Sequence, residues 1–197
     1  MNSFKTISIT TEGIYKEKGS KFMSFAIPVQ NVEEVKEIVK VYHKRFFDAR
    51  HVCYAYMLGA ERSDFRANDD GEPSGTAGRP ILGQINSREL TNILVIVVRY
   101  FGGVLLGTGG LVVAYKEATA DALNQAEIIE KTVDEQISIN FDYLIMNDVM
   151  RIIKEANPQI ISQVFDNLCC MKLSIRKQDA PLLIAKLEKI IGVEIEK

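Results

Sequence analysis

Residues 93–98 are all aliphatic, and this short run constrains the fold more than any other part of the chain. A strand with one face in water alternates apolar and polar residues, whereas a strand buried on both faces has no polar position. The run is far shorter than the ~20 apolar residues that cross a bilayer. It therefore predicts the central strand of a sheet that is covered on both faces, within an α+β protein.

Other strands and helices are predicted around this run. Their patterns predict strands at residues 6–11, 22–29 and 51–58. Asn31, followed three residues later by Glu34, forms a capping-box arrangement that starts a helix. Further helices are expected around residues 81–85 and from the glycines after residue 106 to about Gln125. Residues 59–80 are polar and rich in glycine, and a stretch of this length is not an idle connection in a compact domain.

The last third of the chain has the order βαββαβ. Ile137, Ile139 and Phe141 alternate with polar residues, a helix follows over residues 143–156, and a hairpin turns at residues 166–167. Residues 168–176 form the second arm of the hairpin, so that Cys169 is expected inside and Cys170 outside. A second helix and a strand at residues 193–195 complete a ferredoxin-like unit. We therefore predict two domains, 1–131 and 135–197.

Charge and cysteine content restrict the classes of partner and site. The formal net charge of −2 gives no global attraction to nucleic acid or membranes, so RNA binding would need a local basic patch. The three cysteines include no C-x-x-C pair, which argues against a zinc site and a disulfide framework. Reduced thiols and the lack of a long apolar run predict a cytoplasmic protein without a membrane partner.

The polar loop at residues 69–80 carries the richest chemistry. Asp69, Asp70 and Glu72 offer oxygen ligands for a hard cation, but their spacing is not that of an EF-hand. We favour acids that cap turns and helix starts, with no metal and no cofactor. The loop also offers anion contacts, and we favour a binding surface over an inert loop; these contacts come from the glycines, Ser74, Thr76 and Arg79.

The segment after the central strand is rich in glycine and leads into a helix. Arg99 and Tyr100 end the strand, Gly102 and Gly103 follow, and residues 107–110 precede the helix. A helix N-terminus of this kind can bind an anion. However, Thr108 stands where a P-loop requires lysine, and the dinucleotide-binding glycine pattern also fails. Close packing of the helix on the strand explains the glycines equally well.

Two further patterns remain open to more than one interpretation. Arg50 and His51 begin a strand in which His51 and Cys53 share a face, but two residues do not make a nucleophilic site. The early part of the chain interleaves basic and aromatic residues, which is typical either of an RNA-binding face or of a solvated face over a core. These residues include Lys16, Lys18, Lys21, Lys40, Lys44, Arg45, Tyr15, Phe22, Tyr42 and Phe46.

Three segments together resemble the IMPACT/YigZ family. They are residues 18–22, residues 50–56 with 69–82, and residues 98–111. The resemblance implies a first domain similar to domain two of ribosomal small-subunit protein five and a second domain similar to domain five of elongation factor G. The resemblance also implies that eukaryotic members restrain a starvation-activated kinase that controls translation initiation, using an additional N-terminal domain that is not expected here. The chain therefore resembles the bacterial two-domain form. Val113 departs from the family pattern, where many members carry arginine, and this removes one anion contact.

These observations lead to one functional hypothesis and one alternative. The first is a non-catalytic, translation-linked binding or regulatory protein that contacts RNA, the ribosome or a translation protein. The alternative is a small-molecule enzyme, a phosphotransferase or hydrolase, that uses the loop at residues 69–79. An exposed apolar patch would favour a protein partner. The expected binding residues are Arg50, His51, Asp69, Asp70, Glu72, Ser74, Thr76, Arg79, Arg99, Tyr100, Gly102 and Gly103.

Overall fold

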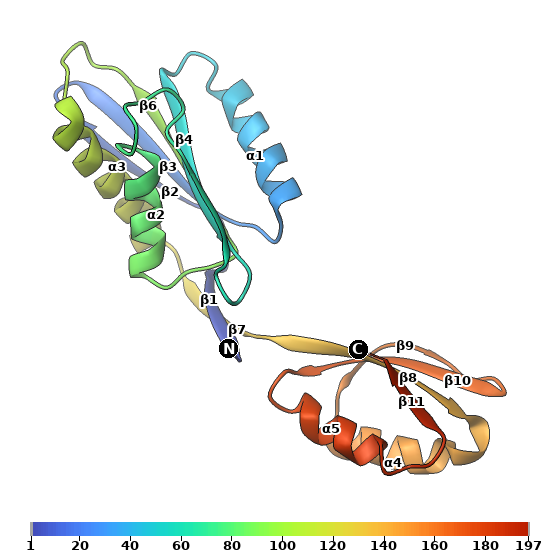
Figure 1. Cartoon of the computed structure of the whole chain (residues 1–197). Helices are drawn as coiled ribbons and strands as arrows, with labels where there is room; N and C mark the ends of the chain where they lie inside the picture. The colour runs from blue at the N-terminus through green and yellow to red at the C-terminus, as the bar shows by residue number, and fades with distance from the viewer. Residues whose placement is uncertain (1, 197) are drawn as a thin grey trace. The chain divides into compact units, whose positions relative to one another are not determined.

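The computed structural model describes residues 2–196, which divide into two compact units (Figure 1). The first unit comprises residues 4–131, and the second comprises residues 132–196 together with residues 2 and 3. No helix in these described residues is long and apolar enough to cross a membrane. The elements of the first unit are β1 (Ser3–Ile7), β2 (Thr11–Glu17), β3 (Ser20–Pro28), α1 (Val32–Arg45), β4 (His51–Leu58), β5 (Asp64–Asn68), α2 (Gly78–Ser87), β6 (Ile93–Tyr100), α3 (Gly107–Asn124) and β7 (Ile128–Thr132).

The central strand of the first unit is β6, in an antiparallel sheet with the order β2-β3-β6-β4-β5. Alternate side chains of β6 enter two separate cores. Ile93, Val95 and Val97 pack with α2 and α3 on one face (Figure 1). Leu94, Ile96 and Val98 pack with α1 on the other face. The structure therefore confirms that residues 93–98 form a strand covered on both faces.

Helix α1 begins where the capping box predicted. The Asn31 side chain accepts a hydrogen bond from the Glu34 backbone N–H at 2.9 Å, and the Glu34 carboxylate accepts one from the Gln30 N–H at 2.7 Å. These contacts satisfy backbone donors that have no partner within the helix. At the other end of α1, Tyr42 and Phe46 pack on Phe25, so these aromatic residues belong to the core.

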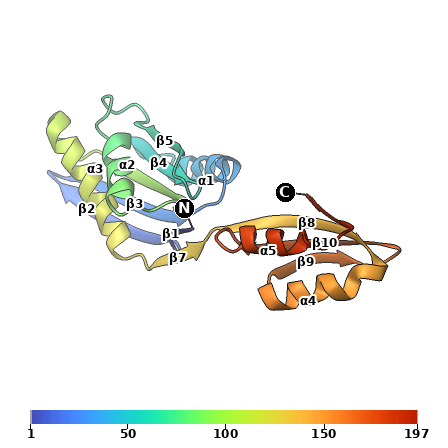
Figure 2. The same cartoon turned by 60° about the horizontal axis from the view of Figure 1, so that its bottom comes forward.

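The strands depart from the sequence-based expectations in three places. The strand expected at residues 6–11 is interrupted, because β1 ends at Ile7 and β2 begins at Thr11. Strand β7 pairs with β1, although residues 128–132 gave no strand signal (Figure 2). Strand β5 lies inside the polar stretch at residues 59–80. It is an edge strand with exposed side chains, so it lacks the apolar alternation by which strands are recognised.

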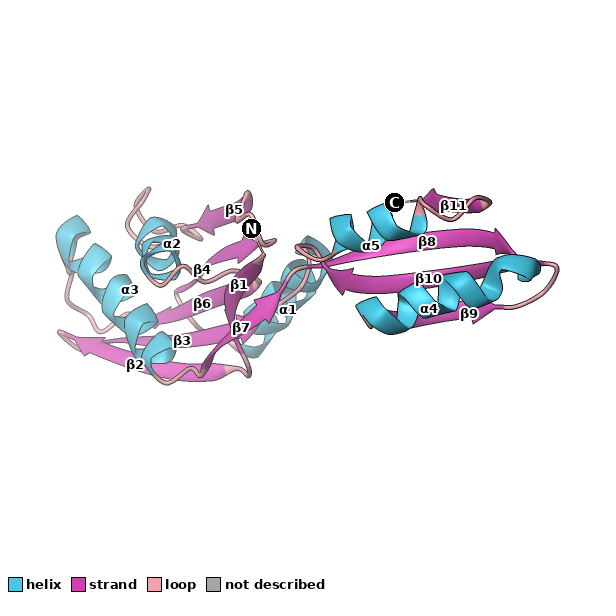
Figure 3. Cartoon of the chain, turned by 90° about the horizontal axis from the view of Figure 1, so that it is seen from below, coloured by secondary structure: helices cyan, strands magenta, loops and turns pink. Residues whose placement is uncertain are grey.

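The second unit confirms the predicted βαββαβ order. Its four-stranded sheet has the order β11-β8-β10-β9, with α4 and α5 on one face (Figure 3). Ile137, Ile139 and Phe141 of β8 face the helices and pair with alternate residues of β10. The elements are β8 (Asp134–Asp142), a 3-10 turn (Tyr143–Ile145), α4 (Met146–Ala156), β9 (Gln159–Val164), β10 (Leu168–Arg176), α5 (Ala180–Leu187) and β11 (Val193–Glu196).

The three thiols should differ in reactivity because the fold buries them to different degrees. Cys53 and Cys169 are fully buried, whereas Cys170, on the opposite face of β10, is partly exposed. Burial also raises the pKa of the Cys53 thiol, which keeps it protonated and unreactive. A thiol reagent should therefore modify Cys170 first in the native protein and all three thiols in urea. Native Cys170→Ser protein should remain unmodified over the same period; fast labelling of Cys169 would show that the register of β10 is wrong by one residue.

Candidate functional site

A cavity of about 500 Å³ opens at one end of the first unit. It lies where β4 begins, β6 ends and α3 starts, beside the loop that follows β5. The structure confirms the expectation that Arg50, Arg99 and this loop converge on one surface. The cavity is lined by Arg50, His51, Gly71, Glu72, Pro73, Arg99, Phe101, Leu105, Leu106, Gly107, Thr108 and Leu111.

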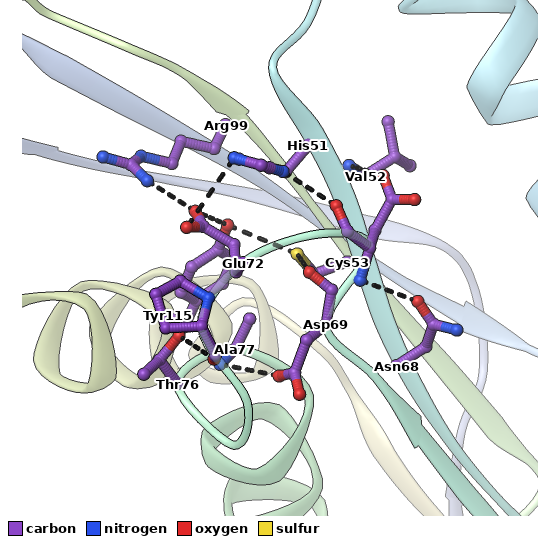
Figure 4. A network of polar contacts seen from close by, with 12 residues as sticks. His51, Val52, Cys53, Asn68, Asp69, Glu72, Thr76, Ala77, Arg99 and Tyr115 are labelled. Carbon is purple, nitrogen blue, oxygen red and sulfur yellow. Dashed lines mark hydrogen bonds and ion pairs between the residues drawn. The ribbon is translucent and has the colours of Figure 1, made fainter. Parts of the chain in front are cut away.

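The carboxylate of Glu72 is the centre of the polar contacts at this cavity (Figure 4). One oxygen, Oε1, accepts hydrogen bonds from Arg99 Nη1 at 2.6 Å and from the Tyr115 hydroxyl at 2.8 Å. The other, Oε2, lies 3.7 Å from His51 Nε2. Glu72 is only 8% exposed and Arg99 only 5%, so this is a buried ion pair. A buried charge is stable only when it is paired and hydrogen-bonded, and here Arg99 and Tyr115 meet both conditions.

Strand pairing brings His51 and Arg99 to the same side of the sheet. They are opposite each other in the β4–β6 ladder, and directly opposite residues point to the same face. His51 Nδ1 lies 2.7 Å from the carbonyl oxygen of Asp70, which can only accept a hydrogen bond. His51 therefore carries a proton on Nδ1 and turns Nε2 towards Glu72.

Asp69 organises the loop that carries Glu72. Its carboxylate accepts backbone hydrogen bonds from Gly75 at 2.8 Å, Ala77 at 3.0 Å and Gly78 at 2.8 Å, and so caps the start of α2. Burial alone would raise the pKa of Asp69, but these hydrogen bonds and the nearby Arg79 lower it overall. The structure confirms that this acid caps a helix start.

Asp70 has a second structural role. Its Oδ2 accepts a hydrogen bond from the Val52 N–H at 2.6 Å, which ties the loop to β4. Gly71 follows with a φ of +82°, a conformation that residues with a Cβ rarely adopt.

No group of three or more His, Cys, Asp or Glu side chains among residues 2–196 is arranged to hold a metal ion.

Cys53 and Tyr115 complete the buried network behind Glu72. The Cys53 thiol lies 3.0 Å from the Asp69 carbonyl oxygen and 3.3 Å from the Tyr115 hydroxyl. Burial raises the pKa of Tyr115, and the neighbouring Cys53 and Glu72 raise it further. Both side chains therefore keep their protons, and the two contacts of the Cys53 thiol, a carbonyl oxygen and a hydroxyl, do not activate it as a nucleophile.

Several of the expected binding residues lie away from the cavity lining. Ser74 is exposed on the loop, and Arg79 is exposed in the first turn of α2. Thr76 is buried, and its hydroxyl donates a hydrogen bond to the Pro73 carbonyl at 2.6 Å. The structure separates Tyr100 from Arg99, because successive residues of a strand point to opposite faces. Tyr100 lies on the α1 side of the sheet, where its hydroxyl donates a hydrogen bond to Asp48 at 2.9 Å.

Gly102 and Gly103 are also outside the cavity lining, and the structure favours packing as the reason for these glycines. A Cβ on Gly102 would lie 1.9 Å from the carbonyl carbon of Gly19, so only glycine allows the β2–β3 turn to come this close. Gly103 has a φ of +88°. Both glycines are needed for backbone geometry, with no ligand required to explain them.

The sequence analysis missed the apolar part of the lining. Phe101, Leu105, Leu106 and Leu111 line the cavity, and the first two are well exposed. The sequence does contain a sign of this apolar lining. Phe101 and residues 104–106 are large apolar residues in a glycine-rich loop that belongs to neither a strand nor a helix.

Substitution of Glu72 tests the buried network. Glu72→Gln leaves the Arg99 charge buried without its counter-charge, so unfolding should become easier by about 3 kcal/mol or more. Glu89→Gln is the matched control, because the Lys5–Glu89 pair is exposed and contributes little. Urea denaturation of the three proteins measures the difference. Equal midpoints for Glu72→Gln and the wild type would show that the pair does not hold the loop in place.

Comparison with known proteins places this chain in one family. Residues 18–123 match the model of the Impact N-terminal domain. IMPACT family member YigZ of Escherichia coli (strain K12) is 32% identical over 86% of this chain and 84% of its own length. IMPACT family member YvyE of Bacillus subtilis (strain 168) is 32% identical over 79% of this chain and 72% of its own. A crystal structure of a hypothetical protein, 29% identical, superimposes with a TM-score of 0.77 over 99% of this chain and 97% of that one. The matched family model and these relatives show that the chain belongs to the IMPACT family.

Proposed function

We propose that this chain is a translation-linked regulatory protein that acts by binding a protein partner at the cavity of the first unit. The link to translation rests on membership of the IMPACT family and on the role in translation initiation that the resemblance implies for its eukaryotic members. Relatives named "Protein IMPACT" match 46% of this chain, and the family model covers residues 18–123, which lie within the first unit. The part shared across the family therefore includes the cavity.

The observation that carries this proposal is the exposed apolar segment at the mouth of the cavity. Phe101 and Leu105 line the cavity, Val104 lies between them in the chain, and Leu105 is 82% exposed. Large apolar side chains gathered beside a cavity are typical of a surface that another protein covers. The arrangement gives a partner an apolar anchor point with Arg50 beside it.

The charges around the cavity favour a protein over RNA. An RNA-binding surface neutralises several phosphates with free cations. Arg50 is exposed, but Arg99 is buried and already neutralised by Glu72. Lys21 is opposite Tyr100 in the β3–β6 ladder and so lies on the other face of the sheet from Arg99. Of the two arginines that line the cavity, only Arg50 is therefore a free, exposed cation.

The carboxylates of the enzyme alternative are all engaged in the fold. Asp69 caps α2, Asp70 holds the Val52 N–H, and Glu72 pairs with Arg99. A general base or nucleophile has to be free to meet a substrate proton or carbon. The geometry therefore supports binding over a phosphotransferase or hydrolase reaction.

Site-specific photo-crosslinking in cells tests the proposal. A benzophenone amino acid at position 105 should capture a translation factor or ribosomal protein. The same group at position 47 is the matched control, because Phe47 is 85% exposed but lies outside the cavity lining. Capture of RNA instead of protein from position 105, or the same products from both positions, would contradict the proposal.

Affinity for the captured protein should depend on the apolar segment. Leu105→Ala should weaken binding about tenfold, since burial of a leucine side chain contributes ~1.5–3 kcal/mol. Val41→Ala should leave affinity unchanged, because Val41 is an exposed apolar residue of α1, on the opposite face of the sheet. Titration by isothermal calorimetry measures both effects, and equal affinity for the two variants would place the binding surface elsewhere.

A further inference from the structure

A second hollow lies on the opposite face of the same sheet, between α1 and strands β4 and β5. It has a volume of about 370 Å³. Three valines of α1 line it together with Lys36, Lys40, His43, Tyr54, Tyr56 and Arg66. We call it the α1 groove. Because Tyr54 and Tyr56 belong to the α1-side core, the sheet separates this groove from the Glu72 cavity.

The cations of the α1 groove come from two elements and face a common space. Lys36, Lys40 and His43 follow the i, i+4, i+7 spacing that places side chains on one side of a helix. Arg66 comes from β5, where it is opposite Tyr56 in the β4–β5 ladder. The groove therefore has positive side chains on the helix side and on the strand side.

No carboxylate belongs to the described lining of the groove, and none of its permanent cations has a counter-charge there. Within residues 2–196, Lys36, Lys40 and Arg66 form no ion pair. Asp64, which lies outside the lining, interacts with the Tyr56 hydroxyl. Two lysines at i and i+4 repel each other and destabilise an isolated helix. A negatively charged ligand would relieve this repulsion.

The floor of the groove distinguishes between two kinds of anionic ligand. Single-stranded RNA needs exposed aromatic faces on which bases can stack. Tyr56 is only 7% exposed, and the rings of Tyr42 and Phe46 are packed on Phe25. Tyr54 also lines the groove but is only partly exposed, and the rest of the floor is aliphatic, from Val32, Val35 and Val39. An apolar floor between cationic sides suits a peptide that carries one aliphatic side chain between carboxylates.

We infer that the α1 groove binds an acidic peptide segment of a partner protein, with an aliphatic side chain on the valine floor and carboxylates on Lys36, Lys40 and Arg66. This surface is additional to the apolar face of the Glu72 cavity, and binding at one does not require binding at the other. The inference therefore stands or falls independently of the function proposed above.

Fluorescence anisotropy with defined probes tests the inference. The main probe is a labelled ten-residue peptide of Asp and Glu with one central Leu. Three further probes are the same peptide with Asn and Gln in place of the acids, the acidic peptide with Gly in place of Leu, and a ten-nucleotide oligouridine. The full-length protein and its Lys40→Gln, Arg66→Gln and Lys44→Gln variants are titrated against each. Lys44 is the matched control, since it is an exposed lysine of α1 outside the groove lining.

The acidic peptide with Leu should bind most tightly, and its neutral counterpart should not bind measurably. Lys40→Gln and Arg66→Gln should each weaken binding about threefold to fivefold, as expected for loss of one exposed charge contact. Lys44→Gln should bind as the wild type does. Because the lysines repel each other, Lys40→Gln should unfold at the same or a higher urea concentration, so that weaker binding is not due to misfolding.

Several results would overturn the inference. Tighter binding of oligouridine than of the acidic peptide, with the same dependence on Lys40 and Arg66, would make the groove a nucleic-acid site. Equal weakening by Lys44→Gln and Lys40→Gln would show unspecific attraction to the whole helix. Equal affinity for the peptides with Leu and Gly would remove the role of the valine floor, and absence of binding by every peptide would refute the inference outright.

Discussion

The buried carboxylate of Glu72 holds four parts of the first unit at one point. Its own loop follows β5, Arg99 comes from the end of β6, His51 comes from the start of β4, and Tyr115 comes from α3. An uncompensated carboxylate in this position would be expensive, so the four parts are stable only in the arrangement that pairs it. The position of the cavity follows from this pairing, since Glu72, Arg99 and His51 line it.

The sequence predicted the parts of the fold that depend on apolar patterning. The central strand and the βαββαβ unit were recognisable because burial on two faces or one face leaves a direct periodic signal. Strand β5 was not recognisable, because its exposed side chains carry no such signal. Hydrogen bonding to β4 places it at the edge of the sheet, and backbone hydrogen bonds do not depend on side-chain polarity.

The candidate site was predictable in location but not in detail. The loop and Arg99 pointed to the correct end of the sheet, yet the partners of Glu72 lie 27 and 43 residues away in sequence and share no pattern with it. Strand alternation alone assigns the adjacent residues Arg99 and Tyr100 to opposite faces of the sheet, so only one of them can line the cavity. The apolar segment after Phe101 lies outside strands and helices, so no periodic pattern assigns its side chains to a face.

The order of strands in the first sheet has a consequence for how the protein folds as it is made. Strand β6 lies between β3 and β4 but follows both in the chain, so neither can pair with its central neighbour until β6 has been synthesised. The β2–β3 and β4–β5 pairs are local hairpins that can form early. At ribosomal rates of roughly 5–20 residues per second, β6 is completed seconds after these hairpins. During that time the edges of β3 and β4 that later pair with β6 have no partner strand. The most deeply buried strand of the sheet therefore arrives last, and its insertion joins two preformed halves.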